Sequence, residues 1–167
     1  MLESITIRPI EKIDNQGIAK IIRNTLTEFK ANKPGTVYYD SSTDFLFELF
    51  TKTPNSQYFV ALNNNELVGG AGIFPTPNLP AGTCELVKMY LLPHVRGIGL
   101  GKKLIATAIE WAKATGYNQI YLETMPELNK AVKVYEKLGF HYLSEPLGNS
   151  GHHGCDLWML KEIINNN

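Results

Sequence analysis

One glycine-rich stretch decides how the chain is read: Arg96-Gly97-Ile98-Gly99-Leu100-Gly101. It follows an apolar run that ends at Pro93 and precedes an amphipathic segment that begins at Lys102. Glycines that alternate with other residues at a helix start leave backbone N–H groups uncovered, and such groups bind phosphate. A glycine-rich turn that binds nothing fits this stretch equally well, because short glycine motifs are weak evidence. The rest of the chain has to separate these two interpretations.

The composition predicts one domain over residues 1–167, because 44% of the residues are hydrophobic and neither a repeat nor a linker interrupts the chain. Sixteen basic and sixteen acidic residues give zero net charge, so we expect no nucleic-acid and no membrane partner. The start lacks a leader pattern, and no apolar run approaches the roughly 18 residues of a membrane span. Cys84 and Cys155 form no Cys-x-x-Cys motif, which predicts free thiols in a cytoplasmic protein.

Hydrophobic periodicity predicts strands and helices in a mixed order. Strands are expected at residues 4–10, 57–62, 66–74, 83–92, 119–123, 140–143 and 155–160. Helices are expected where apolar residues recur at helical spacing within residues 18–29, 45–50, 100–112 and 128–138, and Asp14 or Asn15 can cap the first of them. Three glycines inside one strand, Gly69, Gly70 and Gly72, indicate a bulge or a close backbone approach. The order β-α-α-β-β-β-α-β-α-β-β predicts a mixed α/β sheet and not a regularly wound parallel one.

Two common phosphate-binding motifs do not fit the glycines. A nucleoside-triphosphate loop needs a hydroxyl side chain after its lysine, whereas Lys103 follows Lys102 here. A dinucleotide fold needs Gly-x-Gly-x-x-Gly in the first βαβ unit, whereas these glycines lie in the middle of the chain. Any phosphate site at this stretch must therefore belong to another class of protein.

A longer pattern around the glycines is informative. Residues 89–104 resemble the main coenzyme A motif of the GNAT superfamily of N-acetyltransferases, in which Gln/Arg-x-x-Gly-x-Gly/Ala follows the central strand. A second family feature, a helix that closes in Tyr-x-x-x-Gly-Phe, is present at residues 135–140. Both motifs, and the strand order, follow the family pattern across essentially the whole chain. The resemblance implies an α+β GNAT-like fold, a mixed and mostly antiparallel twisted sheet flanked by helices.

The same resemblance implies acetyl-coenzyme A as the acyl donor, with no metal. Amides at the helix start would bind its pyrophosphate, and the edge of the central strand would pair with its pantetheine arm as another strand would. The strand side chains could equally be core. The implied coenzyme contacts are Met89, Tyr90, Leu91, Arg96, Gly97, Ile98, Gly99, Leu100, Gly101 and Lys102.

One position departs from the family pattern. Many members carry an Asn that contacts the coenzyme seven residues before the motif tyrosine, where this chain has Leu128. Asn129 follows one residue later, and a shift of one residue turns a helical side chain by about 100°. Asn129 is therefore a candidate coenzyme contact whose alternative is an ordinary residue of a first helical turn.

Aminolysis of a thioester needs a base that frees the amine and an acid that protonates the departing thiolate. The resemblance implies that Glu85, on the central strand, is the general base, acting directly or through water, with Glu123 at the end of the next strand as its rival. Tyr135 matches the family tyrosine that faces the sulfur and acts as general acid. Each residue also has a structural interpretation, since carboxylates at strand ends pair with basic neighbours and Tyr135 continues an apolar helical stripe.

The sequence therefore predicts an N-acetyltransferase that moves the acetyl group to a primary amine by direct transfer in a ternary complex. The alternative is a non-catalytic acyl-coenzyme A-binding sensor or interaction module. The acceptor would be a small-molecule amine or an amine of a peptide or protein, and residues 37–50 and 144–154 would border its site. A homodimer is possible from the sequence. His152 and His153, with Cys155, lack a matched second pair of ligands, so we expect no metal site there.

Overall fold

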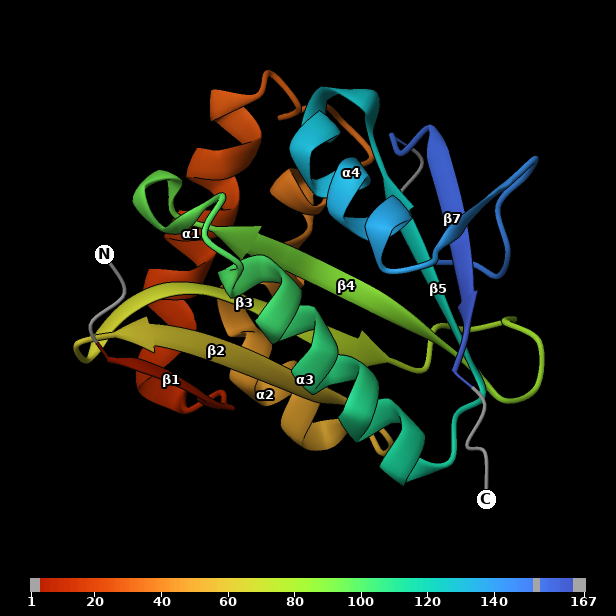
Figure 1. Cartoon of the computed structure of the whole chain (residues 1–167), viewed down its shortest axis with the longest axis horizontal. Helices are drawn as coiled ribbons and strands as arrows, with labels where there is room; N and C mark the ends of the chain where they lie inside the picture. The colour runs from red at the N-terminus through yellow and green to blue at the C-terminus, as the bar shows by residue number, and fades with distance from the viewer. Residues whose placement is uncertain (1–3, 152–153, 164–167) are drawn as a thin grey trace.

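The computed structural model describes residues 4–151 and 154–163 (Figure 1). Its seven-stranded sheet has the order β1-β2-β3-β4-β5-β7-β6. Within the described residues, only β4 and β5 pair in parallel, and the other neighbours are antiparallel, which confirms the expected mixed sheet. The strands are β1 (Ile5–Pro9), β2 (Gln57–Asn63), β3 (Glu66–Phe74), β4 (Thr83–Leu91), β5 (Gln119–Thr124), β6 (His141–Leu143) and β7 (Leu157–Glu162).

Helices cover both faces of this sheet (Figure 1). The α-helices are α1 (Asn15–Glu28), α2 (Leu46–Lys52), α3 (Leu100–Thr115) and α4 (Asn129–Lys137). Short 3-10 turns are η1 (Lys12–Asp14), η2 (Val37–Tyr39), η3 (Ser41–Phe45), η4 (Pro93–Val95) and η5 (Pro126–Leu128). The predicted order of strands and α-helices is therefore correct, and the 3-10 turns were not predicted. Along the described residues, no helix is long and apolar enough to cross a membrane.

Two apolar cores lie on opposite faces of the sheet. On β2, Phe59 and Ala61 belong to the core that includes α3, whereas Tyr58 and Val60 belong to the core that includes α1 and α2. This alternation arises because successive side chains of a strand point to opposite faces. The central strands are consequently buried from both sides, and ligand access to β4 is possible only where a neighbouring strand leaves its edge.

The predicted irregularity around the β3 glycines is confirmed, and the extra residue lies on β4. Gly70 pairs with Tyr90 but Gly72 pairs with Val87, so β4 has one residue more than β3 between these pairs. The bulged residue Lys88 has a positive φ of 52°. A bulge of this kind bends a strand and re-aims its side chains.

The glycines of β3 make room for the tyrosine that holds this bulge. A Cβ at Gly70 would lie 2.7 Å from the Tyr58 hydroxyl, and a Cβ at Gly72 would lie 2.6 Å from its ring. The Tyr58 side chain therefore crosses β3, and its hydroxyl donates to the Lys88 carbonyl oxygen at 2.7 Å. This buried hydrogen bond satisfies a carbonyl that the bulge removes from the regular ladder.

Candidate active site

The site begins where β4 and β5 separate. Within residues 4–151 and 154–163, the two strands pair only from Thr83 opposite Gln119 to Glu85 opposite Tyr121, and then diverge (Figure 1). On its other side, β4 continues to pair with β3 as far as Leu91. Over residues 86–91, the edge of β4 toward β5 therefore has no strand partner in the described part of the chain. The Leu91 carbonyl accepts from the Arg96 Nε, and the backbone groups of this edge that the protein does not bind itself are available to a ligand.

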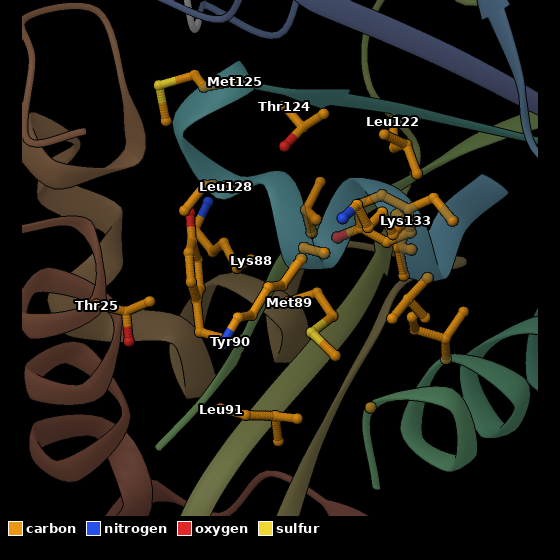
Figure 2. A pocket seen from close by; sticks show the side chains of 18 of the residues that line it. Thr25, Lys88, Met89, Tyr90, Leu91, Leu122, Thr124, Met125, Leu128 and Lys133 are labelled. Atoms are coloured by element: carbon orange, nitrogen blue, oxygen red, sulfur yellow. The ribbon is translucent and has the colours of Figure 1, made fainter. Parts of the chain in front are cut away.

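A cavity of about 560 Å³ fills the space between the diverging strands. Figure 2 shows its walls: Met89, Tyr90 and Leu91 extend from β4, Leu122 and Thr124 from β5, and Lys133 from α4. The glycine-rich stretch also lines the cavity, as do Thr25 of α1 and Phe29, the residue that directly follows this helix. A cleft lined by residues 85–91 of β4 and by the glycines at the start of α3 suits an elongated ligand with a phosphate end.

Most of the predicted site residues come together around this cavity. Glu85, Met89, Tyr90, Leu91, Arg96, Gly97, Gly99, Gly101, Lys102, Glu123 and Tyr135 all line it. Three others are absent from its lining. Leu100 is 1% exposed and packs in the core beneath α3, whereas Ile98 is 49% exposed. Asn129 is exposed at the start of α4, and Leu128 lines the cavity instead.

The three glycines of the stretch serve two different purposes. Gly97 and Gly99 have positive φ values of 76° and 89°, and a Cβ at either would meet open space. These glycines are needed for their backbone conformation, which side chains disfavour. Gly101 has an ordinary conformation, but its Cβ would approach the Met89 side chain to 3.1 Å, so it allows α3 to lie close to β4.

The start of α3 presents amides that the helix itself does not use. The hydrogen bond from the Lys103 N–H to the Gly99 carbonyl, at 3.1 Å, closes the first turn. The preceding amides of Leu100, Gly101 and Lys102 have no carbonyl one turn earlier in the helix to bind. With the dipole of a 16-residue helix behind them, these groups favour an anion at the cavity end.

Arg96 holds the glycine-rich stretch against α1 and β4. Its guanidinium donates to Glu28 at 2.6 and 3.1 Å, and its Nε donates to the Leu91 carbonyl at 3.0 Å. The same guanidinium lies over the Phe29 ring, 5.1 Å from the centroid. Its charge is thus already partnered within the protein, and its side chain fixes where the loop begins.

Glu85 lies at the point where β4 and β5 part. It is 3% exposed, and its Oε1 accepts a hydrogen bond of 2.5 Å from the Thr76 hydroxyl. A buried carboxylate at the inner end of a cleft is well placed to accept a proton from a bound ligand.

Glu123 has a different environment. Its Oε2 accepts a 2.6 Å hydrogen bond from the Tyr121 hydroxyl, and its Oε1 accepts one from the Ser150 hydroxyl. The Tyr121 hydroxyl in turn accepts from the Leu147 amide at 3.1 Å. Glu123 and Tyr121 therefore attach the segment after β6 to β5, and both oxygens of Glu123 are occupied.

Tyr135 is buried on α4 and packs against Phe140, with ring centroids 5.8 Å apart. Burial raises the pKa of its hydroxyl, so the group stays protonated at neutral pH. In the described chain this hydroxyl has no hydrogen-bond partner, although it belongs to a residue that lines the cavity. A buried tyrosine hydroxyl normally has a partner, and here a ligand in the cavity can provide one.

Sequence reasoning missed Lys88, which lines the cavity from the β4 bulge (Figure 2). Its side chain is 5% exposed, and Asp40 Oδ2 is 4.0 Å from its Nζ. The available signal was a lysine inside the otherwise apolar run of residues 86–92. Its orientation could not be predicted, because the bulge depends on Tyr58 and the β3 glycines.

The environment of the two cysteines disfavours thiol chemistry. Burial raises the pKa of both the Cys84 and Cys155 thiols to about 12, which disfavours the nucleophilic thiolate. The described ranges contain no group of three or more His, Cys, Asp or Glu side chains that could hold a metal ion. His152 and His153 lie outside these ranges.

These features define an α/β protein whose sheet opens to hold a ligand against the start of a helix. A family model described as the acetyltransferase (GNAT) family matches residues 15–140, and the chain belongs to this family. The resemblance noted from the two motifs is thereby confirmed.

Relatives support the same family. The chain is 39% identical over 163 residues to an uncharacterized N-acetyltransferase of Escherichia coli (strain K12), YjgM, covering 96% of each sequence. Its fold is similar to that of a GNAT acetyltransferase of Staphylococcus aureus Mu50, with a TM-score of 0.82, 19% identity and coverage of 96% of this chain and 100% of that one. It is also similar to the PaiA N-acetyltransferase of Thermoplasma acidophilum, solved with coenzyme A, with a TM-score of 0.74, 20% identity and coverage of 95% and 99%.

Proposed function

We propose that the protein transfers the acetyl group of acetyl-coenzyme A directly to a primary amine within a ternary complex. The observation that carries this proposal is the unpaired edge of β4, which leads from the buried Glu85 to the amides at the start of α3. A ligand with amides along its length and phosphates at one end fits this track. The coenzyme A bound to the Thermoplasma relative is such a ligand.

The coenzyme would be held mainly by backbone groups. Its pantetheine amides pair with β4 at Met89, Tyr90 and Leu91, as an added strand would. Its pyrophosphate accepts hydrogen bonds from the amides of residues 97–102, and Lys102 adds positive charge at the exposed rim. Arg96 supports this arrangement by fixing the loop to Glu28.

The chemical step uses two side chains at the inner end of the cleft. Glu85 accepts a proton from the acceptor ammonium, and the freed amine attacks the thioester carbonyl carbon. As the new C–N bond forms, the C–S bond breaks and its electron pair leaves with the sulfur. Tyr135 donates its hydroxyl proton to this thiolate. The attacking nitrogen loses its second proton through water as the amide forms, and this proton restores the Tyr135 hydroxyl. Glu123 keeps the neighbouring segment in place through Ser150.

Coenzyme A binding is the first test. A ligand at about 100 times its Kd stabilises a protein by about 2.7 kcal/mol, which raises the Tm by several degrees in a chain of this size. We expect acetyl-coenzyme A and coenzyme A to produce this shift. No shift with either one would refute the proposal at its first step.

Turnover is the second test, because binding alone does not distinguish an enzyme from a sensor. Incubation with acetyl-coenzyme A and a panel of small amines and peptides should release free coenzyme A thiol, with acetylated amine formed in equal amount. A thermal shift without thiol release across the panel would favour the non-catalytic module. A cytoplasmic location and a homodimer stay predictions from the sequence.

A further inference from the structure

A second, smaller cavity adjoins the inner end of the cleft. Its volume is about 150 Å³, and Glu85, Val87 and Lys88 line both cavities. These residues of β4 therefore form the boundary between them. Asp40, Ser42, Thr76 and Ser150 supply polar groups to the small cavity. An acceptor in the small cavity can therefore contact Glu85, which also lines the larger one.

Lys88 is the unusual group at this boundary. A lysine ammonium has three donors and no acceptor, and burying its charge is costly unless it is paired. Burial lowers the pKa of Lys88, and the carboxylates of Asp40 and Glu85 counteract this effect. Within the described residues, the ammonium donates no hydrogen bond, and Asp40 Oδ2, at 4.0 Å, is the only carboxylate oxygen within that distance.

Asp40 is held in place by another task. Its Oδ1 accepts from the Ser42 amide at 2.9 Å and from the Ser42 hydroxyl at 2.7 Å, which caps the 3-10 turn η3. Moving the carboxylate into direct contact with Lys88 would disrupt this cap. Lys88 thus lines the cavity, and the N–H donors of its ammonium are available to a ligand.

We propose that Lys88 binds an anionic group of the acceptor, and that the acceptor is therefore a short amine that also carries a carboxylate, such as an amino acid. The inference rests on the proposed function, because it takes Glu85 as the group that faces the amine. A carboxylate next to Lys88 forms a charge-assisted hydrogen bond, which Asp40 at 4.0 Å does not. The small cavity volume favours a small molecule over a folded protein segment.

A binding experiment tests this directly without requiring turnover. The protein is saturated with coenzyme A and titrated calorimetrically with N-acetylated products of glycine, alanine, methionine, phenylalanine, β-alanine and γ-aminobutyrate. Each acid is compared with its primary amide, which has nearly the same shape and no charge. For at least one pair we expect the acid to bind about tenfold more tightly, the effect of one charge-assisted hydrogen bond.

Three variants assign that preference to Lys88. Lys88→Met keeps most of the side-chain length and should remove the preference for the acid. Lys20→Met removes the same charge from an exposed position on α1 and should leave it unchanged. Asp40→Asn keeps an acceptor for the Ser42 amide but removes the facing negative charge, so it should increase the preference. A retained thermal shift with coenzyme A shows that each variant is folded.

The outcomes separate this inference from the proposed function. Equal binding of acids and amides, no binding of any acid, or a preference that survives in Lys88→Met would each overturn the role of Lys88. If the acids bind through Lys88 but acetyl-coenzyme A and the parent amino acids release no free thiol, the role of Lys88 is confirmed and the enzymatic proposal is refuted. If only the amino-acid amides are acetylated efficiently, the proposal that the acceptor carries a carboxylate is refuted and the enzymatic proposal stands.

Discussion

The two ends of the cleft differ in the groups that form them: main-chain groups form one end and side chains form the other. The coenzyme end consists of backbone: the free edge of β4 and the amides at the start of α3, from one continuous segment of residues 86–102. The end where we propose that the acceptor binds consists of side chains from distant segments, namely Asp40, Thr76, Lys88 and Ser150. Backbone geometry recurs whenever the local pattern recurs, whereas side chains can change one at a time. The main-chain end is therefore informative about the type of reaction, and the side-chain end is informative about the acceptor substrate.

The largest effect should come from the backbone of the coenzyme end. Gly99→Val places a β-branched residue at a φ of 89°, which strains the start of α3 and misdirects its amides. We expect the thermal shift with coenzyme A to be lost, which corresponds to an affinity at least about 100-fold weaker. Gly116→Ala is the matched control, because Gly116 has a φ of 105° at the other end of the same helix. It should lower the Tm but keep the response to coenzyme A.

The next effect distinguishes the two carboxylates. Glu85→Gln should lower kcat for amine acetylation by about 100-fold while the thermal shift with coenzyme A is unchanged, because the loss is that of a general base. Glu123→Gln should cost less than about tenfold, because this carboxylate already accepts hydrogen bonds from Tyr121 and Ser150. A larger loss in Glu123→Gln than in Glu85→Gln would reverse the two roles.

A smaller effect is expected at the sulfur. Tyr135→Phe removes a hydroxyl that has no partner in the described protein, so packing against Phe140 should survive. We expect kcat to fall by about tenfold, since a thiol with a pKa of about 8.5 departs with limited help from an acid. Tyr142→Phe, which removes an exposed hydroxyl bound to Glu136, should leave kcat unchanged. An unaltered kcat in Tyr135→Phe would mean that Tyr135 packs against Phe140 and is not the general acid.

The smallest effect concerns the scaffold that joins the two ends. Tyr58→Phe removes the hydroxyl that donates to the Lys88 carbonyl, leaving a buried acceptor without its partner. The free energy of unfolding should fall by about 1 kcal/mol, measured by urea denaturation. Tyr142→Phe serves again as the control, with a change within about 0.5 kcal/mol, because its side chain is half exposed. A neutral Tyr58→Phe would mean that the β3 glycines alone maintain the bulge.

The sequence was informative where function follows from local backbone pattern. The helix starting at Leu100 and the irregularity at the β3 glycines were both predicted, because positive φ values and close approaches require glycine. Lys88 was not, because its direction depends on a tyrosine 30 residues earlier in the chain. The contact between Arg96 and Glu28 was not predicted either, because Glu28 lies 68 residues away and no local pattern indicates it.

The short pairing of β4 with β5 has a consequence for motion. Among the described residues, only three pairs join β4 to β5, so few main-chain hydrogen bonds cross the seam between these two strands. A bound pantetheine chain would act as an inserted strand and supply the missing ones. Amide hydrogens of residues 86–91 that face the seam should therefore exchange quickly in the free protein and slowly in the complex. The coenzyme would then be a structural part of the sheet as well as a reactant.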